Sequence, residues 1–169
     1  MFRAALVMIA IAGIAVSILA APKALAQSES AIDIGMARPL NSEELYRLYN
    51  SRSWLWKAGA GHFSVKERRF SAWSNENASP SYGVGRWFIT DPGKLCFRAV
   101  WRAETGAARA LTCFGHREKD GVIYQRREPN GQWYVFRSAP LRSGDEAAKL
   151  RYGDYVAGRL NRLETVGNR

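Results

Sequence analysis

The sequence predicts a mainly β protein, in which an antiparallel meander of about eight strands closes into a small barrel behind a short helix. Short segments rich in aromatic and β-branched residues follow one another between Ser53 and Arg137, and tight turn sequences separate them. Loops this short pair neighbouring segments antiparallel. A long meander leaves two unpaired edges unless it curls shut, so we expect a barrel, with a two-sheet sandwich as the alternative.

The first 26 residues have the layout of a secretory signal peptide. Arg3 supplies a positive start, residues 4–20 form an uncharged apolar run, and Ala24 and Ala26 provide small residues at a cleavage site. A membrane anchor is the alternative, and the polar residues that follow favour cleavage. We therefore expect a periplasmic or secreted protein with no transmembrane span after cleavage. Residues 27–40 show no periodicity and predict an extended leader.

A single domain is expected over residues 41–154. Asn41 and Glu44 form the pattern of a capping box, and Leu45, Leu48 and Tyr49 follow at helical spacing, which predicts a helix closing one end of the barrel. The predicted strands cover residues 54–57, 61–65, 69–73, 81–90, 94–102, 108–116, 122–127 and 132–138. Gly83 and Gly85 lie inside one of them and would permit a sharp bend. Residues 145–150 predict a short helix, and residues 155–169 a loose tail.

The two cysteines of the chain are expected to form a disulfide. If the turn between their strands centres on Glu104 and Thr105, Cys96 and Cys113 lie directly opposite each other, within reach of a disulfide. In an exported protein, the oxidising compartment would convert such a pair of thiols to a disulfide. Two alternatives stay open: a metal site, which would need about four ligands, and a catalytic thiol with His62 or His116 as its base.

Charge and aromatic content indicate a binding protein. Without its signal peptide the chain has 23 basic and 15 acidic residues, a net charge of +8. In an exported protein the expected partner is an envelope polysaccharide, a lipid or a protein, and we expect no nucleic acid. The alternative explanations are that the positive charge keeps the protein soluble and that the aromatic residues pack in the core. The binding residues that we predict are Trp56, Tyr82, Arg86, Arg126, Arg127, Trp133 and Arg137.

No familiar catalytic, metal-binding or phosphate-binding motif is present, so we expect no catalytic set, no metal and no cofactor. Two other functions stay open. One is a hydrolase of envelope glycans or esters that uses His116 or His62 as a base. The other is a secreted inhibitor or interaction module that binds through a protruding loop at residues 74–79.

Three segments of the chain resemble a known family: YGVGRWFITDPGKLCFRAVW, ALTCFGH and GVIYQRREPNGQWYVFRSA. They are similar to secreted proteins of unknown function, mostly from alphaproteobacteria of the rhizobial group. The likeness runs from about Leu48 to Asp154 and implies an exported envelope protein without an established reaction. Positions that match the family are Gly85, Trp87, Leu95, Cys96, Trp101, Cys113, His116 and Tyr124. In architecture alone the chain is similar to lipocalin-type barrels, which hold small hydrophobic ligands.

Overall fold

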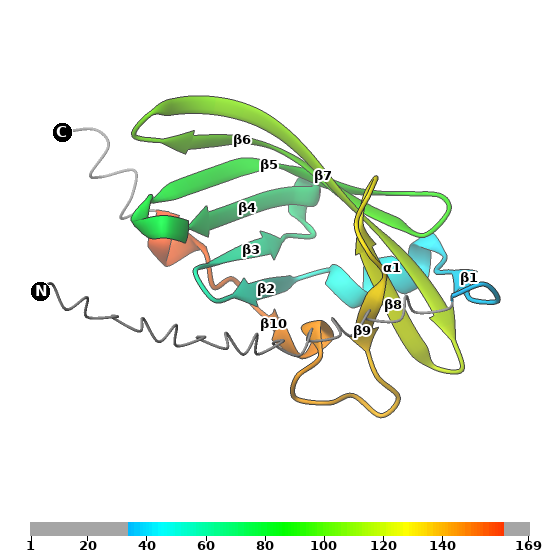
Figure 1. Ribbon diagram of the computed structural model, residues 1–169. Helices are drawn as coiled ribbons and strands as arrows, with labels where there is room; N and C mark the ends of the chain where they lie inside the picture. Colours follow the sequence, from blue (N-terminus) through cyan, green and yellow to red (C-terminus); the bar gives the residue numbers. More distant parts are fainter. Residues whose placement is uncertain (1–33, 161–169) are drawn as a thin grey trace, which may run out of the picture. The chain divides into compact units, whose positions relative to one another are not determined.

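The computed structural model describes residues 34–160, which form a curled antiparallel sheet with one short helix (Figure 1). Nine strands follow one another in a single ladder in the order β10-β2-β3-β4-β5-β6-β7-β8-β9, and β1 pairs with β7 beside it. The strands are β1 (Arg38–Pro39), β2 (Arg52–Trp56), β3 (Gly59–Phe63), β4 (Arg69–Ser74), β5 (Ser81–Thr90), β6 (Lys94–Ala103), β7 (Gly106–Lys119), β8 (Val122–Arg127), β9 (Tyr134–Arg137) and β10 (Leu150–Tyr152).

The predicted meander is confirmed from β2 to β9, where every strand pairs with its neighbour in sequence. The expected bounds of β5 and β8 coincide with the observed ones. Tight turns join these strands, and Gly93 and Gly121 occupy two of them with positive φ angles of 61° and 80°. Glycine adopts this left-handed conformation without the steric cost that a Cβ brings.

The sheet curls into a half-barrel whose concave side carries the large apolar residues. Phe63, Phe70, Trp87 and Leu95 are buried there in one core cluster. The strands approach each other very closely at Gly85, where an added Cβ would stand 1.8 Å from the carbonyl oxygen of Arg98. Only a residue without a side chain fits this contact, as expected for a glycine inside a bent strand.

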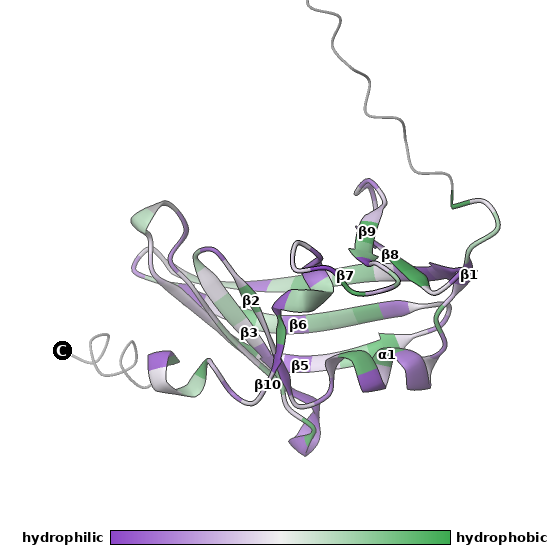
Figure 2. Cartoon of the chain, turned by 90° about the horizontal axis from the view of Figure 1, so that it is seen from below, coloured by the Kyte–Doolittle hydropathy of each residue, from purple (hydrophilic) through white to green (hydrophobic). Residues whose placement is uncertain are grey.

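The helix α1 (Ser42–Tyr49) begins with the predicted capping box. The Asn41 side chain accepts a hydrogen bond from the Glu44 backbone N–H at 2.9 Å, and the Glu44 carboxylate accepts one from the Asn41 N–H at 2.8 Å. Leu45 and Tyr49 are fully buried in the core of the half-barrel. Figure 2 shows the hydrophobic side of α1 turned toward the sheet.

The two ends of the ladder, β9 and β10, are joined by residues 138–149 instead of by strand pairing. This connection carries the 3-10 helix η3 (Glu146–Lys149), which packs against β9 on one side and against β2 and β10 on the other. Asp145 holds the connection in shape, because its carboxylate accepts hydrogen bonds from the backbone N–H groups of Ser138 at 2.8 Å and Arg142 at 2.9 Å. These hydrogen bonds lower the pKa of Asp145.

The structure differs from the sequence expectation at both ends of the domain. Leu40, expected in an extended leader, is buried in the core, and the adjoining β1 pairs with β7. Val156 and Leu160, expected in a loose tail, are buried against Ala60 on the outer side of the sheet. Apolar side chains at spacing four explain the second difference, since they place one helical face on the sheet.

The predicted signal peptide, most of the predicted leader and the last nine residues lie outside the described residues. None of the helices within residues 34–160 has the length and apolar character of a membrane span.

Candidate functional site

The two cysteines form a disulfide on the outer side of the half-barrel. Cys96 in β6 lies directly opposite Cys113 in β7, as the sequence predicted, and their Cα atoms are 4.1 Å apart. Neither sulfur is free to bind a metal or to attack a substrate. On the concave side of the same hairpin, Phe97 lies opposite Thr112 and Trp101 opposite Ala108.

His116 lies on the concave side, in a buried network of polar side chains. Its Nε2 atom is 2.8 Å from Tyr49 Oη and 2.7 Å from Gln125 Nε2. The ring is 1% exposed, and burial lowers the pKa of His116 to about 4. Burial also raises the pKa of Tyr49. A substrate therefore has no access to this imidazole, which is neutral at pH 7.

His62 lies on the outer side of the sheet beside two serines. Its Nδ1 is 3.1 Å from Ser53 Oγ, and Ser71 is its partner across β3 and β4. The Ser53 hydroxyl is buried and donates to the carbonyl oxygen of Gly153 at 2.8 Å. This serine is tied to the backbone and cannot face a substrate, so the Ser–His contact here stabilises the segment after β10.

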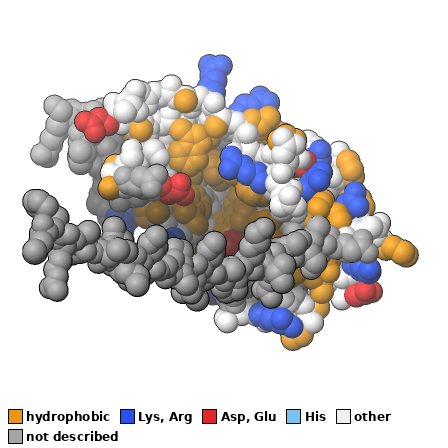
Figure 3. Space-filling view, viewed as in Figure 1, with side chains coloured by type: hydrophobic (Ala, Val, Ile, Leu, Met, Phe, Trp, Pro, Cys, Tyr) orange, Lys and Arg blue, Asp and Glu red, His pale blue; other side chains and the backbone are white. Residues whose placement is uncertain are grey.

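Aromatic side chains converge on an open cavity of about 360 Å³ in the half-barrel. We call it the aromatic cavity. Its aromatic walls come from five strands, β2, β3, β4, β6 and β7, because each strand turns every second side chain inward. Figure 3 shows hydrophobic side chains gathered in the hollow of this face. The aromatic lining residues are Trp54, Trp56, Phe63, Phe70, Phe97, Trp101 and Phe114.

A few polar groups stand among these aromatic walls: Glu76, Thr112, Arg127 and Glu146. Glu146 is engaged, since it accepts a hydrogen bond from Trp54 Nε1 at 3.2 Å and pairs with Lys149. Among residues 34–160 the Arg127 guanidinium has no ion pair and no hydrogen-bond acceptor. The cavity therefore offers apolar walls, the Arg127 guanidinium without a partner among the described residues, and the carboxylates of Glu76 and Glu146.

A comparison with family models matches residues 14–156 to a family described as "Protein of unknown function (DUF995)". The chain belongs to this family. No curated protein and no solved structure matches it. The function of this DUF995 protein is therefore inferred from the geometry of its own side chains.

The binding residues predicted for this DUF995 protein do not gather in one place. Trp56 and Arg127 line the aromatic cavity. Arg126 points to the other side of β8, where its guanidinium lies 4.8 Å from the centre of the Trp133 ring and pairs with Glu128 at 3.1 Å. The remaining three lie apart from these and from one another. Tyr82 packs against the cluster of Ala60, Val156 and Leu160 on the outer side of the sheet. Arg86 donates to the Glu67 carbonyl oxygen, and Arg137 lies at the end of the ladder.

The prediction named one of the seven aromatic residues around the cavity, Trp56, and missed the other six. Register is the signal that would have found them, because partners across paired strands share one face of a sheet. Trp54 lies opposite Gly61, and Gly61 lies opposite Ala72. The small residues leave room for the rings of their neighbours. The omitted residues are Trp54, Phe63, Phe70, Phe97, Trp101 and Phe114.

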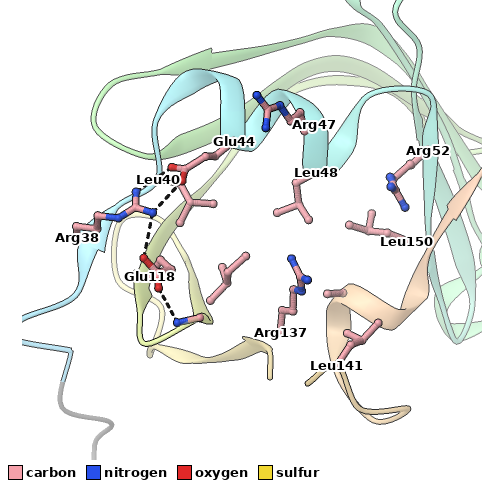
Figure 4. Close-up of a pocket in the computed structure, with 13 residues that line it drawn as sticks. Arg38, Leu40, Glu44, Arg47, Leu48, Arg52, Glu118, Arg137, Leu141 and Leu150 are labelled. Carbon is pink, nitrogen blue, oxygen red and sulfur yellow. Dashed lines mark hydrogen bonds and ion pairs between the residues drawn. The ribbon is translucent and has the colours of Figure 1, made fainter. Parts of the chain in front are cut away.

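The DUF995 protein has a second, larger pocket where the two ends of the ladder meet, with a volume of about 670 Å³ (Figure 4). We call it the seam pocket. Its charged lining residues are Arg38, Glu44, Arg47, Arg52, Glu118 and Arg137, and its apolar ones include Leu40, Leu48, Ile123, Leu141 and Leu150. Among the described residues no aromatic side chain lines it, so its chemistry differs from that of the aromatic cavity.

Proposed function

We propose that this DUF995 protein is an exported, non-enzymatic binding protein whose aromatic cavity holds the apolar body of a small lipid-type molecule. One observation carries the proposal. Of the seven aromatic side chains around the cavity, only Phe63 and Phe70 are buried, and the other five remain partly exposed to an open space. These rings line a hollow instead of filling it.

Partly exposed rings on a concave face favour a ligand on energetic grounds. Apolar surface removed from water stabilises a complex by about 25 cal/mol per Å². Ligand sites are typically concave and lined mostly by apolar side chains, with a few polar groups that orient the ligand. The aromatic cavity has this composition, with Thr112 and Arg127 among aromatic walls.

Three partner classes were expected from the sequence, namely an envelope polysaccharide, a lipid and a protein. The cavity favours a lipid-type molecule because its walls are apolar and enclose a small volume. Arg127 would attract an acidic or hydroxyl-bearing head group, and Glu76 and Glu146 would orient hydroxyl groups. A polysaccharide chain or a protein would meet more polar surface than this cavity presents.

Export is part of the same proposal. The apolar first 26 residues and the small residues at their end support a signal peptide. The Cys96–Cys113 disulfide supports an oxidising compartment such as the periplasm or the medium. The likeness to secreted alphaproteobacterial proteins supports the same location.

Titration with N-phenyl-1-naphthylamine, an uncharged fluorescent apolar probe, tests the cavity. The purified protein should bind the probe, and Thr112→Trp should weaken binding about tenfold or more because the indole fills the space. Thr105→Trp is the matched control, since Thr105 is exposed in the turn before β7. We expect it to bind like the wild type.

Equal probe affinity in Thr112→Trp and the wild type, at equal melting temperature, would contradict the proposal. Should Thr112→Trp not fold, Trp101→Ala serves in its place, because it removes one wall of the cavity. Native mass spectrometry of protein purified from its own host would then show which molecule the cavity carries.

A further inference from the structure

The seam pocket carries an excess of positive charge that the carboxylates within residues 34–160 do not neutralise. Both of its carboxylates are already bound by one arginine, Arg38, which lies 2.8 Å from Glu44 and 3.0 Å from Glu118. Glu44 also accepts the Asn41 N–H, and Glu118 accepts the Gly121 N–H at 2.7 Å. The Arg38 contact lowers the pKa of Glu44 to about 2, so this carboxylate stays ionised and engaged.

Two further arginines of the pocket have no carboxylate partner within residues 34–160: Arg52 and Arg137. The Arg52 guanidinium lies over the Tyr152 ring, 3.8 Å from its centre, and its Nε is buried without an acceptor among the described residues. A guanidinium stacked on an aromatic ring keeps its N–H groups in its own plane, parallel to the ring, where they can still donate to a ligand. Buried N–H groups without acceptors are rare in native proteins.

Arg52 and Arg137 reach the pocket from opposite ends of the ladder. Arg52 begins β2, which pairs with β10, whereas Arg137 ends β9. Figure 4 shows both side chains directed into the space between α1 and the connection that carries η3. Arg47, from α1, also lines the pocket but pairs with Glu43 on the helix surface.

Apolar side chains fill the spaces between these charges. Leu48 and Leu150 lie on two sides of the pocket, and Leu141 is 51% exposed at its mouth. An inorganic anion would contact only the arginines and leave these leucines in water. A ligand with an anionic group and an apolar chain would use both kinds of wall.

We propose that the seam pocket binds an oxyanion, a phosphate or a carboxylate, carried on an apolar chain, with Arg52 and Arg137 as its ligands. Two arginines suit both oxyanions, because a guanidinium donates two parallel hydrogen bonds to either. This site is separate from the aromatic cavity in its lining residues and chemistry, and it does not depend on the function proposed above.

Calorimetric titration of Thr112→Trp, in which the aromatic cavity is filled, with octyl phosphate, octanoate, octyl glucoside and inorganic phosphate tests this site, with the wild type measured beside it. We expect the first two to bind and the last two to bind at least about tenfold more weakly. With the aromatic cavity filled by Thr112→Trp, the added double change Arg52→Gln/Arg137→Gln should abolish binding of octyl phosphate and octanoate. The matched control, Arg102→Gln/Arg109→Gln, removes the same charge from exposed positions of β6 and β7 and should bind normally.

Unchanged affinity for octyl phosphate and octanoate when Arg52→Gln/Arg137→Gln is added to Thr112→Trp would overturn the proposal. So would equal affinity for octyl glucoside, which has no charge, or for inorganic phosphate, which has no chain. Loss of octyl phosphate binding in Thr112→Trp, compared with the wild type, would place the ligand in the aromatic cavity instead. If the change at Arg52 prevents folding, Arg137→Gln alone tests the site, because Arg137 is exposed at the edge of the sheet and its replacement should not disturb the fold.

Discussion

The Nε2 atom of His116 lies 2.8 Å from the hydroxyl oxygen of Tyr49, in the buried centre of the half-barrel. Gln125 donates an amide N–H to the same hydroxyl at 2.8 Å, and its nitrogen is 2.7 Å from His116 Nε2. An amide nitrogen has no lone pair to offer, so His116 Nε2 must accept. The neutral ring then carries its proton on Nδ1, which is buried and has no acceptor among the described residues.

Stability should fall between pH 7 and pH 5 because of His116. Its pKa is about 4 in the folded protein and 6.5 in an unfolded chain, so the unfolded state gains the proton first as the pH falls. The contribution is complete at pH 7 and decreases from pH 6.5 to pH 4, by about 2 kcal/mol at pH 5. Urea unfolding at both pH values measures it.

The control for this pH effect is His116→Gln, which keeps an acceptor but cannot titrate. Its stability should change much less between pH 7 and pH 5. Glu44 and Asp145, whose pKa values are lowered from ordinary carboxyl values, exert their effect at lower pH. An equal pH dependence in the variant and the wild type would mean that His116 is not the responsible group.

Removal of the disulfide should destabilise the fold without changing its topology. Cys96 and Cys113 are 17 residues apart, and a loop of this length contributes about 3 kcal/mol in the chain-entropy model. Cys96→Ala/Cys113→Ala should therefore lose about that much free energy of unfolding. Addition of reductant to the wild type should have the same effect, and no response to either change would contradict the bridge.

Gly85→Ala should damage the sheet severely. The new Cβ would stand 1.8 Å from the Arg98 carbonyl oxygen and 2.7 Å from the Ala99 Cα, so β5 and β6 must separate. Overpacking of this kind costs at least about 2 kcal/mol. Gly144→Ala, with nothing within 4 Å of its Cβ, should melt near the wild-type temperature. Comparable melting temperatures for both variants would show that the strands have room at position 85.

Replacement of Arg98 should stabilise the protein at low salt. The register places Arg69, Arg86 and Arg98 side by side on the outer side of β4, β5 and β6. Like charges directly opposite each other are destabilising, so Arg98→Thr should gain about 0.5 kcal/mol. High salt should remove most of the gain. Arg102→Thr, whose partners are Tyr82 and Ala107, should show little salt dependence.

The sequence predicted features that depend on near neighbours. Asn41 and Glu44 are three residues apart and mark the start of α1. The tight turn between β6 and β7 fixes the register that brings Cys96 to Cys113. These contacts could be predicted because short loops leave few ways to pair two strands.

The sequence did not predict contacts between distant segments. β10 pairs with β2, so Leu150 lies opposite Trp54, nearly a hundred positions earlier. No turn signal indicates this pairing, which places β10 at the end of the ladder, so the seam pocket between β9 and β10 was missed. Arg126 and Arg127 show a different failure, since neighbours in a strand point to opposite faces and cannot share one site. This alternation was visible in the sequence and argued against grouping them.

The incomplete ladder also bears on how the protein avoids joining to other copies of itself. A half-barrel has two edge strands with unpaired backbone groups, and long flat edges are templates for aggregation. Here the two edge strands are short, with four residues in β9 and three in β10, and η3 packs between them. β9 and β10 therefore offer few backbone groups to a foreign strand, so the two ends of the ladder are poor templates for pairing with another chain.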